Sequence, residues 1–260
     1  MPPWIGLGSI GAAIAAVSSR DVPQRGADGV VNAVPDGDTV VLSDGRLIRL
    51  AGIEAPQRGR RPPGGADAQP FAAEAQAVLD TTVRGRHVVP WFDRERTDRW
   101  GRVVADLQLD DGSWLADVIL AAGAARVVPT AESRSGAARA RLRAMIAVEA
   151  AARAARRGLW AVDFYQVRSP DNPGPPGSFQ LIEGRVTDIA TRRGQWSLRL
   201  GIGDAGVVVG LTASVRRALR AVGRDAAALL GQRVRLRGWV VDRGVPTIEI
   251  AVPEQIEVVE

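Results

Sequence analysis

Apolar and polar residues alternate on both sides of a short polar segment, Ser43-Asp44-Gly45-Arg46. Alternation with a period of two is typical of strands that bury one face, and Asp-Gly between two such runs is typical of a tight hairpin turn. We therefore expect the strands before and after this segment to lie side by side. Residues 98–112 predict a turn and a further strand that ends at Asp111-Gly112.

Three segments have the spacing and end signals of helices. The first follows Pro70 and ends before Gly85, and its apolar face is formed by Phe71, Ala75, Val78 and Leu79. The second begins at a capping Ser113 and is stopped by a glycine at position 123. The third, over residues 135–157, is rich in alanine and arginine and is expected to pack on the rest of its domain through an apolar stripe formed by Leu142, Met145 and Ile146.

The arginines on the outer face of this third helix have two interpretations. They are Arg139, Arg141, Arg153, Arg156 and Arg157. They could attract nucleic acid, but charge on the outer face of a helix usually serves solvation, and we favour solvation here.

A second unit follows a segment that has the composition of a linker. Residues 168–178 contain four prolines and two glycines, which do not form regular structure. From Leu181 onward the chain alternates around two turns and one amphipathic helix near residues 214–222, which predicts a small β-barrel or sandwich. Arg233, Arg235 and Arg237 fall on one face of a strand there, either a basic binding face or, as we favour, an ordinary solvent face.

Composition adds limits on partners and chemistry. The chain has 260 residues, a net charge of +5 and no lysine, so its positive charge rests on arginine, which favours bidentate recognition of phosphate. A GC-rich coding sequence would give the same bias. The absence of cysteine excludes disulfides, thiolate metal sites and a cysteine nucleophile.

An apolar run from Ile5 to Val17 raises the question of localisation. It is long enough for the core of a signal peptide and too short to span a bilayer as a helix, yet no basic residue precedes it. A signal peptide would make the protein secreted or periplasmic. A disordered extension would leave it cytoplasmic, and a membrane anchor is the third alternative.

Two carboxylates and a guanidinium are brought together by the predicted hairpin. They belong to Asp38, Glu54 and Arg49. Ca²⁺ prefers carboxylate and backbone carbonyl oxygens, and a guanidinium can bind phosphate through two parallel hydrogen bonds. The combination predicts a site for a divalent cation and a phosphate.

Four motifs, in order, carry a resemblance to a known family. They are Asp36-Gly37-Asp38-Thr39, the run from Arg49 to Pro56, Asp98-Arg99-Trp100-Gly101-Arg102 and Arg157-Gly158-Leu159-Trp160. Through them the chain resembles the thermonuclease (staphylococcal nuclease-like) phosphodiesterases over Val30 to Trp160. The resemblance implies that Asp38, Glu54 and the Ala55 carbonyl hold Ca²⁺, while Arg49 and Arg102 contact the scissile phosphate.

One position departs from this pattern. The family has a glutamate after the proline, where it orients or deprotonates the attacking water, and this chain has Gln57. A neutral amide can position water but cannot take its proton. Since general base catalysis contributes about 10²- to 10⁴-fold, we expect a weakened enzyme.

The resemblance also implies a fold and a division of the chain. We predict an α+β fold in which a five-stranded β-barrel of the oligonucleotide-binding (OB) type, with packed helices, precedes a smaller β-rich, OB-like C-terminal domain. The boundaries are residues 1–28 for the signal peptide or disordered extension, 29–165 for the thermonuclease-like domain, 166–179 for the linker and 180–260 for the C-terminal domain.

Three functions remain open at this point. The first is a calcium-dependent nuclease that hydrolyses DNA, RNA or both. The second is a non-catalytic nucleic-acid-binding module that keeps the fold and the basic groove but lost its base at Gln57. The third is an envelope interaction module that uses the C-terminal barrel and has no affinity for polynucleotide.

Overall fold

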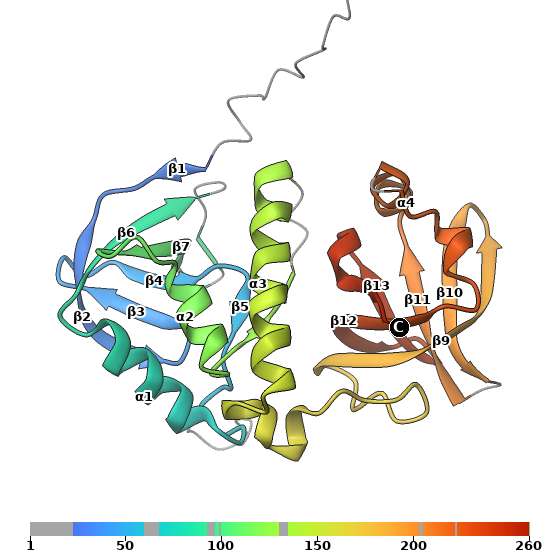
Figure 1. Cartoon of the computed structure of the whole chain (residues 1–260), viewed down its shortest axis with the longest axis horizontal. Coiled ribbons are helices and arrows are strands. Elements are labelled where there is room, and N and C mark those ends of the chain that lie inside the picture. The colour runs from blue at the N-terminus through green and yellow to red at the C-terminus, as the bar shows by residue number, and fades with distance from the viewer. Residues whose placement is uncertain are drawn as a thin grey trace, which may run out of the picture.

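The computed structural model describes residues 23–59, 68–92, 97–98, 100–129, 135–202, 205–221 and 223–259. Two β-barrels stand on either side of one long helix, α3 (Figure 1). The predicted signal peptide or extension lies outside the described residues as far as residue 22. Within the described ranges, no helix is long and apolar enough to cross a membrane.

The prediction of a five-stranded barrel in the first half of the chain is confirmed. The sheet contains β1 (Gln24–Arg25), β2 (Gly29–Asp36), β3 (Thr39–Leu42), β4 (Leu47–Leu50), β6 (His87–Phe92) and β7 (Val103–Leu109). Its order is β1-β6-β2-β3-β4-β7, and the additional pairing of β6 with β7 closes five strands into a barrel with β1 at the edge of β6. β4 and β7 run parallel, whereas the other neighbours are antiparallel. Two short strands, β5 (Ile53–Glu54) and β8 (Arg126–Val127), form a separate sheet.

Three helices belong to this half of the chain. They are α1 (Ala72–Val83), α2 (Leu115–Ala121) and α3 (Gly136–Ala154). The predicted capping role of Ser113 is wrong, because the residue at the start of α2 is Trp114 and the Ser113 hydroxyl donates instead to Asp111 Oδ1. The polar turn that ends β7 therefore engages this hydroxyl before the helix begins.

The end of α2 meets the turn after α3 at two glycines. Gly123 and Gly158 have φ values of +69° and +54°, in the left-handed region that favours glycine. A Cβ on Gly123 would lie 2.2 Å from the Arg157 carbonyl oxygen, and a Cβ on Gly158 would lie 2.3 Å from the Gly123 carbonyl oxygen. The two backbones can approach this closely only without side chains.

We expect Gly123→Ala to lower the free energy of unfolding by more than about 1 kcal/mol, because the new methyl group meets backbone atoms that cannot rotate away. Gly112→Ala is the matched control, since Gly112 also has a positive φ, +84°, but has open space around its Cβ position. Urea unfolding measures both variants. Equal losses would contradict a steric role for the glycine contact.

The second barrel is built from the C-terminal third of the chain. Its strands are β9 (Phe179–Arg192), β10 (Gln195–Ile202), β11 (Ala205–Leu211), β12 (Arg233–Asp242), β13 (Pro246–Ile250) and β14 (Ile256–Val258), with α4 (Ala213–Ala221) between β11 and β12. The order is β13-β11-β10-β9-β12-β14, and β13 also pairs with β12. Short 3₁₀ turns complete the chain at Gly158–Ala161, Asp163–Tyr165, Ala226–Leu229 and Pro253–Gln255.

The two barrels share one topology. In each, the first strand pairs with the second and the fourth, the third runs parallel to the fifth, the fourth pairs with the fifth, and a helix lies between the third and fourth. A five-stranded Greek-key barrel is the architecture of the OB-fold. The prediction of an OB-like C-terminal domain is thus confirmed by strand order and direction.

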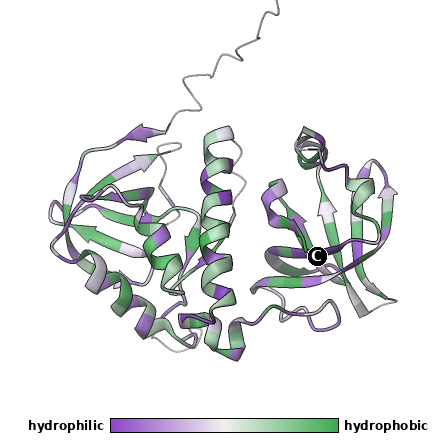
Figure 2. Ribbon diagram, in the orientation of Figure 1, coloured by the Kyte–Doolittle hydropathy of each residue, from purple (hydrophilic) through white to green (hydrophobic). Residues whose placement is uncertain are grey.

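The helix α3 faces both barrels, and this corrects two predictions. In Figure 2, hydrophilic residues interrupt α3 along its length, where it lies between the barrels. Arg139 of α3 pairs with Glu254, and Arg141 pairs with Asp106 of β7. These arginines bind carboxylates of the two barrels, so the interpretation of a solvated outer face is wrong for them.

The second prediction that the structure corrects is the solvent-facing position of Arg237. The three arginines of β12 do share one side of the strand, but Arg233 is 60% exposed in its side chain and Arg237 only 1%. The solvent-face interpretation fails at Arg237 because α3 covers β12 at this position, and Arg237 pairs there with Glu149 of α3.

An apolar cluster also crosses between the two halves. It includes Leu159 and Trp160, which follow α3, together with Phe179 and Leu181 of β9. Val252, near the C-terminus, belongs to the core of the first barrel. The barrels are therefore joined through side chains as well as through the proline-rich segment.

Candidate functional site

The predicted hairpin brings two of the candidate residues together, Asp38 and Arg49. β3 and β4 pair antiparallel, with Thr39 opposite Arg49. Asp38 lies in the turn before β3, and its carbonyl accepts a hydrogen bond from the amide of Leu50. Arg49 Nη2 lies 3.5 Å from Asp38 Oδ2. The local turn chemistry therefore sets a guanidinium beside the first carboxylate.

Asp38 is buried and held by hydrogen bonds at both of its carboxylate oxygens. Thr39 Oγ1 donates to Oδ1 at 2.9 Å, and the Ala55 amide donates to Oδ2 at 3.3 Å. A Cβ at Gly37 would lie 2.7 Å from the Ala55 Cβ, so a glycine is required where these two segments meet. The Asp-Gly-Asp sequence thus lets the turn approach the segment that carries Glu54 and Ala55.

Gln57 lies between two of the candidate metal ligands. Its side-chain Nε2 donates to the Ala55 carbonyl oxygen at 3.0 Å and contacts Asp38 Oδ2 at 3.4 Å. Both partners are acceptors, so only the amide nitrogen suits this position. The two candidate ligand oxygens therefore converge on one point that is occupied by a hydrogen-bond donor of this chain, and a cation at that point would have to displace the amide.

Arg102 is oriented by a carboxylate and by Thr39, the first residue of β3. Its Nε donates to Asp98 Oδ2 at 2.7 Å, and its Nη1 donates to Thr39 Oγ1 at 3.1 Å. The guanidinium also lies over the Trp100 ring, 5.1 Å from the centroid. The Thr39 hydroxyl donates in turn to Asp38, so hydrogen bonds connect Asp98, Arg102, Thr39 and Asp38 in that order. Thr39 thus links Arg102 to Asp38, and it was not among the predicted site residues.

Burial and repulsion act on the other two carboxylates. Burial is the main cause that raises the pKa of Glu54, and Asp38 adds to it, against the attraction of Arg49 and Arg126. Burial and Asp38 likewise raise the pKa of Asp36. The site therefore concentrates negative charge that a cation would neutralise.

We expect Glu54→Gln to stabilise the metal-free protein near neutral pH. A carboxyl whose pKa is raised by folding makes the protein more stable as pH falls through the folded pKa, and costs stability above it. The variant lacks that cost, so its advantage should shrink as pH approaches the ordinary range of glutamate. Urea unfolding in chelator at neutral and acidic pH measures this, and a midpoint below that of wild type at neutral pH would contradict it.

A second residue that the sequence did not indicate is Arg126. It is 7% exposed and lies opposite Glu54 in the pairing of β8 with β5. Its Nη1 donates to the Phe179 carbonyl of β9 at 2.8 Å. Residues 53 positions apart make this contact, and no local motif reveals it.

The carboxylates do not form a complete metal cage. In the described part of the chain, no three acidic or histidine side chains are grouped closely enough to hold a metal ion by themselves. Asp38 Oδ2 and the Ala55 carbonyl, with Glu54 nearby, suit a hard cation that also retains water ligands. The donor set therefore fits Ca²⁺ better than a transition metal, which favours imidazole or thiolate.

A family model described as "Staphylococcal nuclease homologue" matches residues 47–162. The match includes Arg49, Glu54, Gln57 and Arg102 and begins after Asp38.

Individual proteins match the same region. The chain is 32% identical to "Probable endonuclease LCL3" of Verticillium alfalfae over 143 residues, which cover 55% of this chain and 48% of that protein. It is 32% identical to "Thermonuclease" of Staphylococcus intermedius over 97 residues, which cover 36% of this chain and 55% of that protein. The chain thus spans about half of the length of these relatives.

Proposed function

Since residues 47–162 match the model of the staphylococcal nuclease homologues, we propose that the chain is a calcium-dependent phosphodiesterase that cleaves DNA, RNA or both. The observation that carries the proposal is the convergence of Asp38 Oδ2 and the Ala55 carbonyl on one point beside Arg49. Oxygen ligands and a guanidinium at one place suit a cation and a phosphodiester together.

Different residues of the chain would bind the cation and the phosphate. Asp38, Glu54 and the Ala55 carbonyl would bind the cation, which when bound would supply a positive charge to activate water and polarise the phosphoryl group. Arg49 and Arg102 would bind the non-bridging phosphate oxygens and stabilise the charge that develops on them. Asp98 keeps the Arg102 guanidinium oriented before substrate arrives.

Gln57 would have a positioning role. When its amide leaves Asp38 and Ala55, the carbonyl oxygen of the side chain can accept a hydrogen bond from a water molecule and orient it toward phosphorus. The amide cannot accept the proton, so that proton must pass to solvent or to the substrate. We therefore expect cleavage to be slower than with a general base at this position.

A second candidate function is a nucleic-acid-binding module without catalysis. The contact of Gln57 with Asp38 and Ala55 favours it, since the amide satisfies in the resting protein the same oxygens that a cation would need. Such a module would bind polynucleotide with an affinity that falls steeply with salt and would leave it intact.

The test uses the full chain with single-stranded DNA and RNA, in CaCl₂ or in chelator, beside an Asp38→Ala variant. Cleavage that requires both Ca²⁺ and Asp38 is the result expected for the enzyme. Salt-dependent binding with no cleavage at any Ca²⁺ concentration would favour the module. Cleavage that persists in chelator and in Asp38→Ala would overturn the proposed site.

A further inference from the structure

The strand that carries Glu54 depends on one short partner. β5 and β8 contain two residues each, and they pair through Ile53 with Val127 and Glu54 with Arg126. The Val128 amide also donates to the Gly52 carbonyl at 2.8 Å. A ladder this short is not stable in water by itself. The position of Glu54 therefore depends on whatever holds β8 in place.

The second barrel holds the first residue of β8. The buried Arg126 guanidinium donates to the Phe179 carbonyl of β9 and lies over the Tyr165 and Phe179 rings, 5.1 and 5.2 Å from their centroids. A carbonyl oxygen and two ring faces suit a cation that must be desolvated. Arg126 is thus fixed from the side of the second barrel while its backbone pairs with Glu54.

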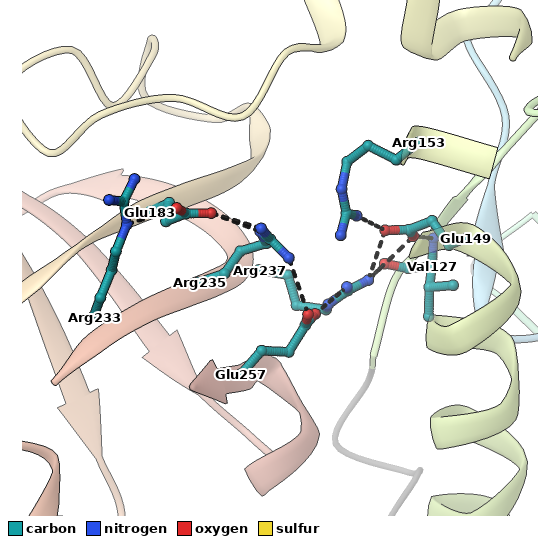
Figure 3. A network of polar contacts seen from close by, with 8 residues as sticks. All are labelled: Val127, Glu149, Arg153, Glu183, Arg233, Arg235, Arg237 and Glu257. Atoms are coloured by element: carbon teal, nitrogen blue, oxygen red, sulfur yellow. Dashed lines mark hydrogen bonds and ion pairs between the residues drawn. The ribbon is translucent and has the colours of Figure 1, made fainter. Parts of the chain in front are cut away.

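The second residue of β8 is held by a buried ionic network (Figure 3). The Val127 amide donates to Glu149 Oε2 of α3 at 2.6 Å. Arg237 of β12 reaches the same carboxylate at 3.1 Å, and its Nη1 also lies 3.4 Å from the Val127 carbonyl oxygen. Arg153 is the second cation on Glu149, at 3.0 Å.

The far side of Arg237 is anchored inside the second barrel. Its Nη2 donates to Glu257 of β14, and Glu257 also pairs with Arg235. The Arg237 and Glu149 side chains are 1% and 0% exposed. The second barrel therefore presents one guanidinium to the end of β8, and the backbone of Val127 contacts this network at both its amide and its carbonyl.

We propose that the second barrel completes the candidate metal site: through Phe179 and Arg237 it holds β8 against β5 and so fixes the Glu54 carboxylate. Arg126 and Arg237 are positioning residues in this inference, and neither is a metal ligand. It rests on the proposed function, because it takes Glu54 as a ligand of Ca²⁺.

At Arg126, a positioning role and simple electrostatics predict opposite changes in Ca²⁺ affinity. The Arg126 guanidinium attracts the Glu54 carboxylate. Removing a cation near a Ca²⁺ site should by itself strengthen Ca²⁺ binding, because the positive charge no longer opposes the ion. Loss of a residue that orients a ligand weakens metal affinity by about 10- to 100-fold. Arg126→Met therefore separates the two effects by sign.

The experiment measures Ca²⁺ affinity of the full chain by calorimetric titration, with no substrate present. The variants are Arg126→Met and the double variant Glu149→Gln/Arg237→Met, which removes both charges of a buried pair and so avoids an uncompensated ion. The control is Arg243→Met/Glu249→Gln, an ion pair of the second barrel 3.1 Å apart whose residues are outside the network of Figure 3. Urea unfolding in chelator establishes that each variant is folded.

We expect both test variants to bind Ca²⁺ about tenfold more weakly or worse and the control to bind as wild type. Their affinity for single-stranded DNA in chelator should not change, because the phosphate-binding arginines are untouched. Wild-type Ca²⁺ affinity in a folded double variant, or tighter binding in Arg126→Met, would overturn the inference alone. Failure of the wild-type chain to bind Ca²⁺ would overturn the proposed function and this inference with it.

Discussion

Replacing Gln57 with glutamate is expected to raise the rate of phosphodiester cleavage by about 10²- to 10⁴-fold, the usual contribution of a general base. A carboxylate can take the proton of the attacking water, which the amide cannot. Single-turnover cleavage of a labelled oligonucleotide at saturating Ca²⁺ measures the change. The gain should appear in the rate constant of the chemical step, because the role proposed for this residue is to act on water, whereas the proposed phosphate contacts belong to Arg49 and Arg102.

The same substitution should change the metal-free protein in the opposite direction. A glutamate at this position cannot donate to Asp38 or to the Ala55 carbonyl, and it brings another negative charge beside Asp38. We therefore expect a lower urea midpoint in chelator and a larger stabilisation by Ca²⁺ than in wild type. Gln57→Leu is the control, since it removes the donor without adding charge. An unchanged cleavage rate in Gln57→Glu would mean that this position does not limit catalysis.

Arg237→Met is expected to lower the free energy of unfolding by about 3–5 kcal/mol, the cost of removing one partner of a buried ion pair. Glu149 is fully buried and would keep Arg153 as its only ionic partner in the described network. Glu257 would retain Arg235. Urea unfolding followed by tryptophan fluorescence measures the loss.

A second variant distinguishes an unpaired charge from lost packing. Adding Glu149→Gln to Arg237→Met should recover most of the lost stability. Replacing both partners of a buried ion pair by uncharged residues often leaves the free energy of unfolding unchanged. Arg233→Met, on the exposed part of the same strand, should change stability by less than about 1 kcal/mol. If the double variant is no more stable than Arg237→Met, the loss is due to packing of the arginine stem.

The features that could be predicted from the sequence are local ones. The Asp-Gly turn specifies the β3–β4 hairpin through neighbouring residues, and this hairpin places Arg49 beside Asp38. Strand alternation likewise indicated the second barrel, although the closing order of its strands depends on pairings between distant segments.

The features that could not be predicted depend on distant contacts. Arg237 meets Val127 across 110 positions, and the period-two pattern of β12 says only that its arginines share a side. Whether that side faces water or α3 is decided by packing of the second barrel on the first. The predicted capping role of Ser113 was wrong for a local reason. The neighbouring Asp111 carboxylate binds the hydroxyl that was expected to cap the helix.

The placement of α3 also bears on how the chain unfolds. Leu142 and Met145 of α3 lie in the core of the first barrel, while Glu149 and Arg139 are tied to strands and turns of the second. Neither barrel can lose its structure without exposing a surface of this helix. The two OB-like halves should therefore melt in a single cooperative transition, and cutting the proline-rich segment between them should not release two independently stable proteins.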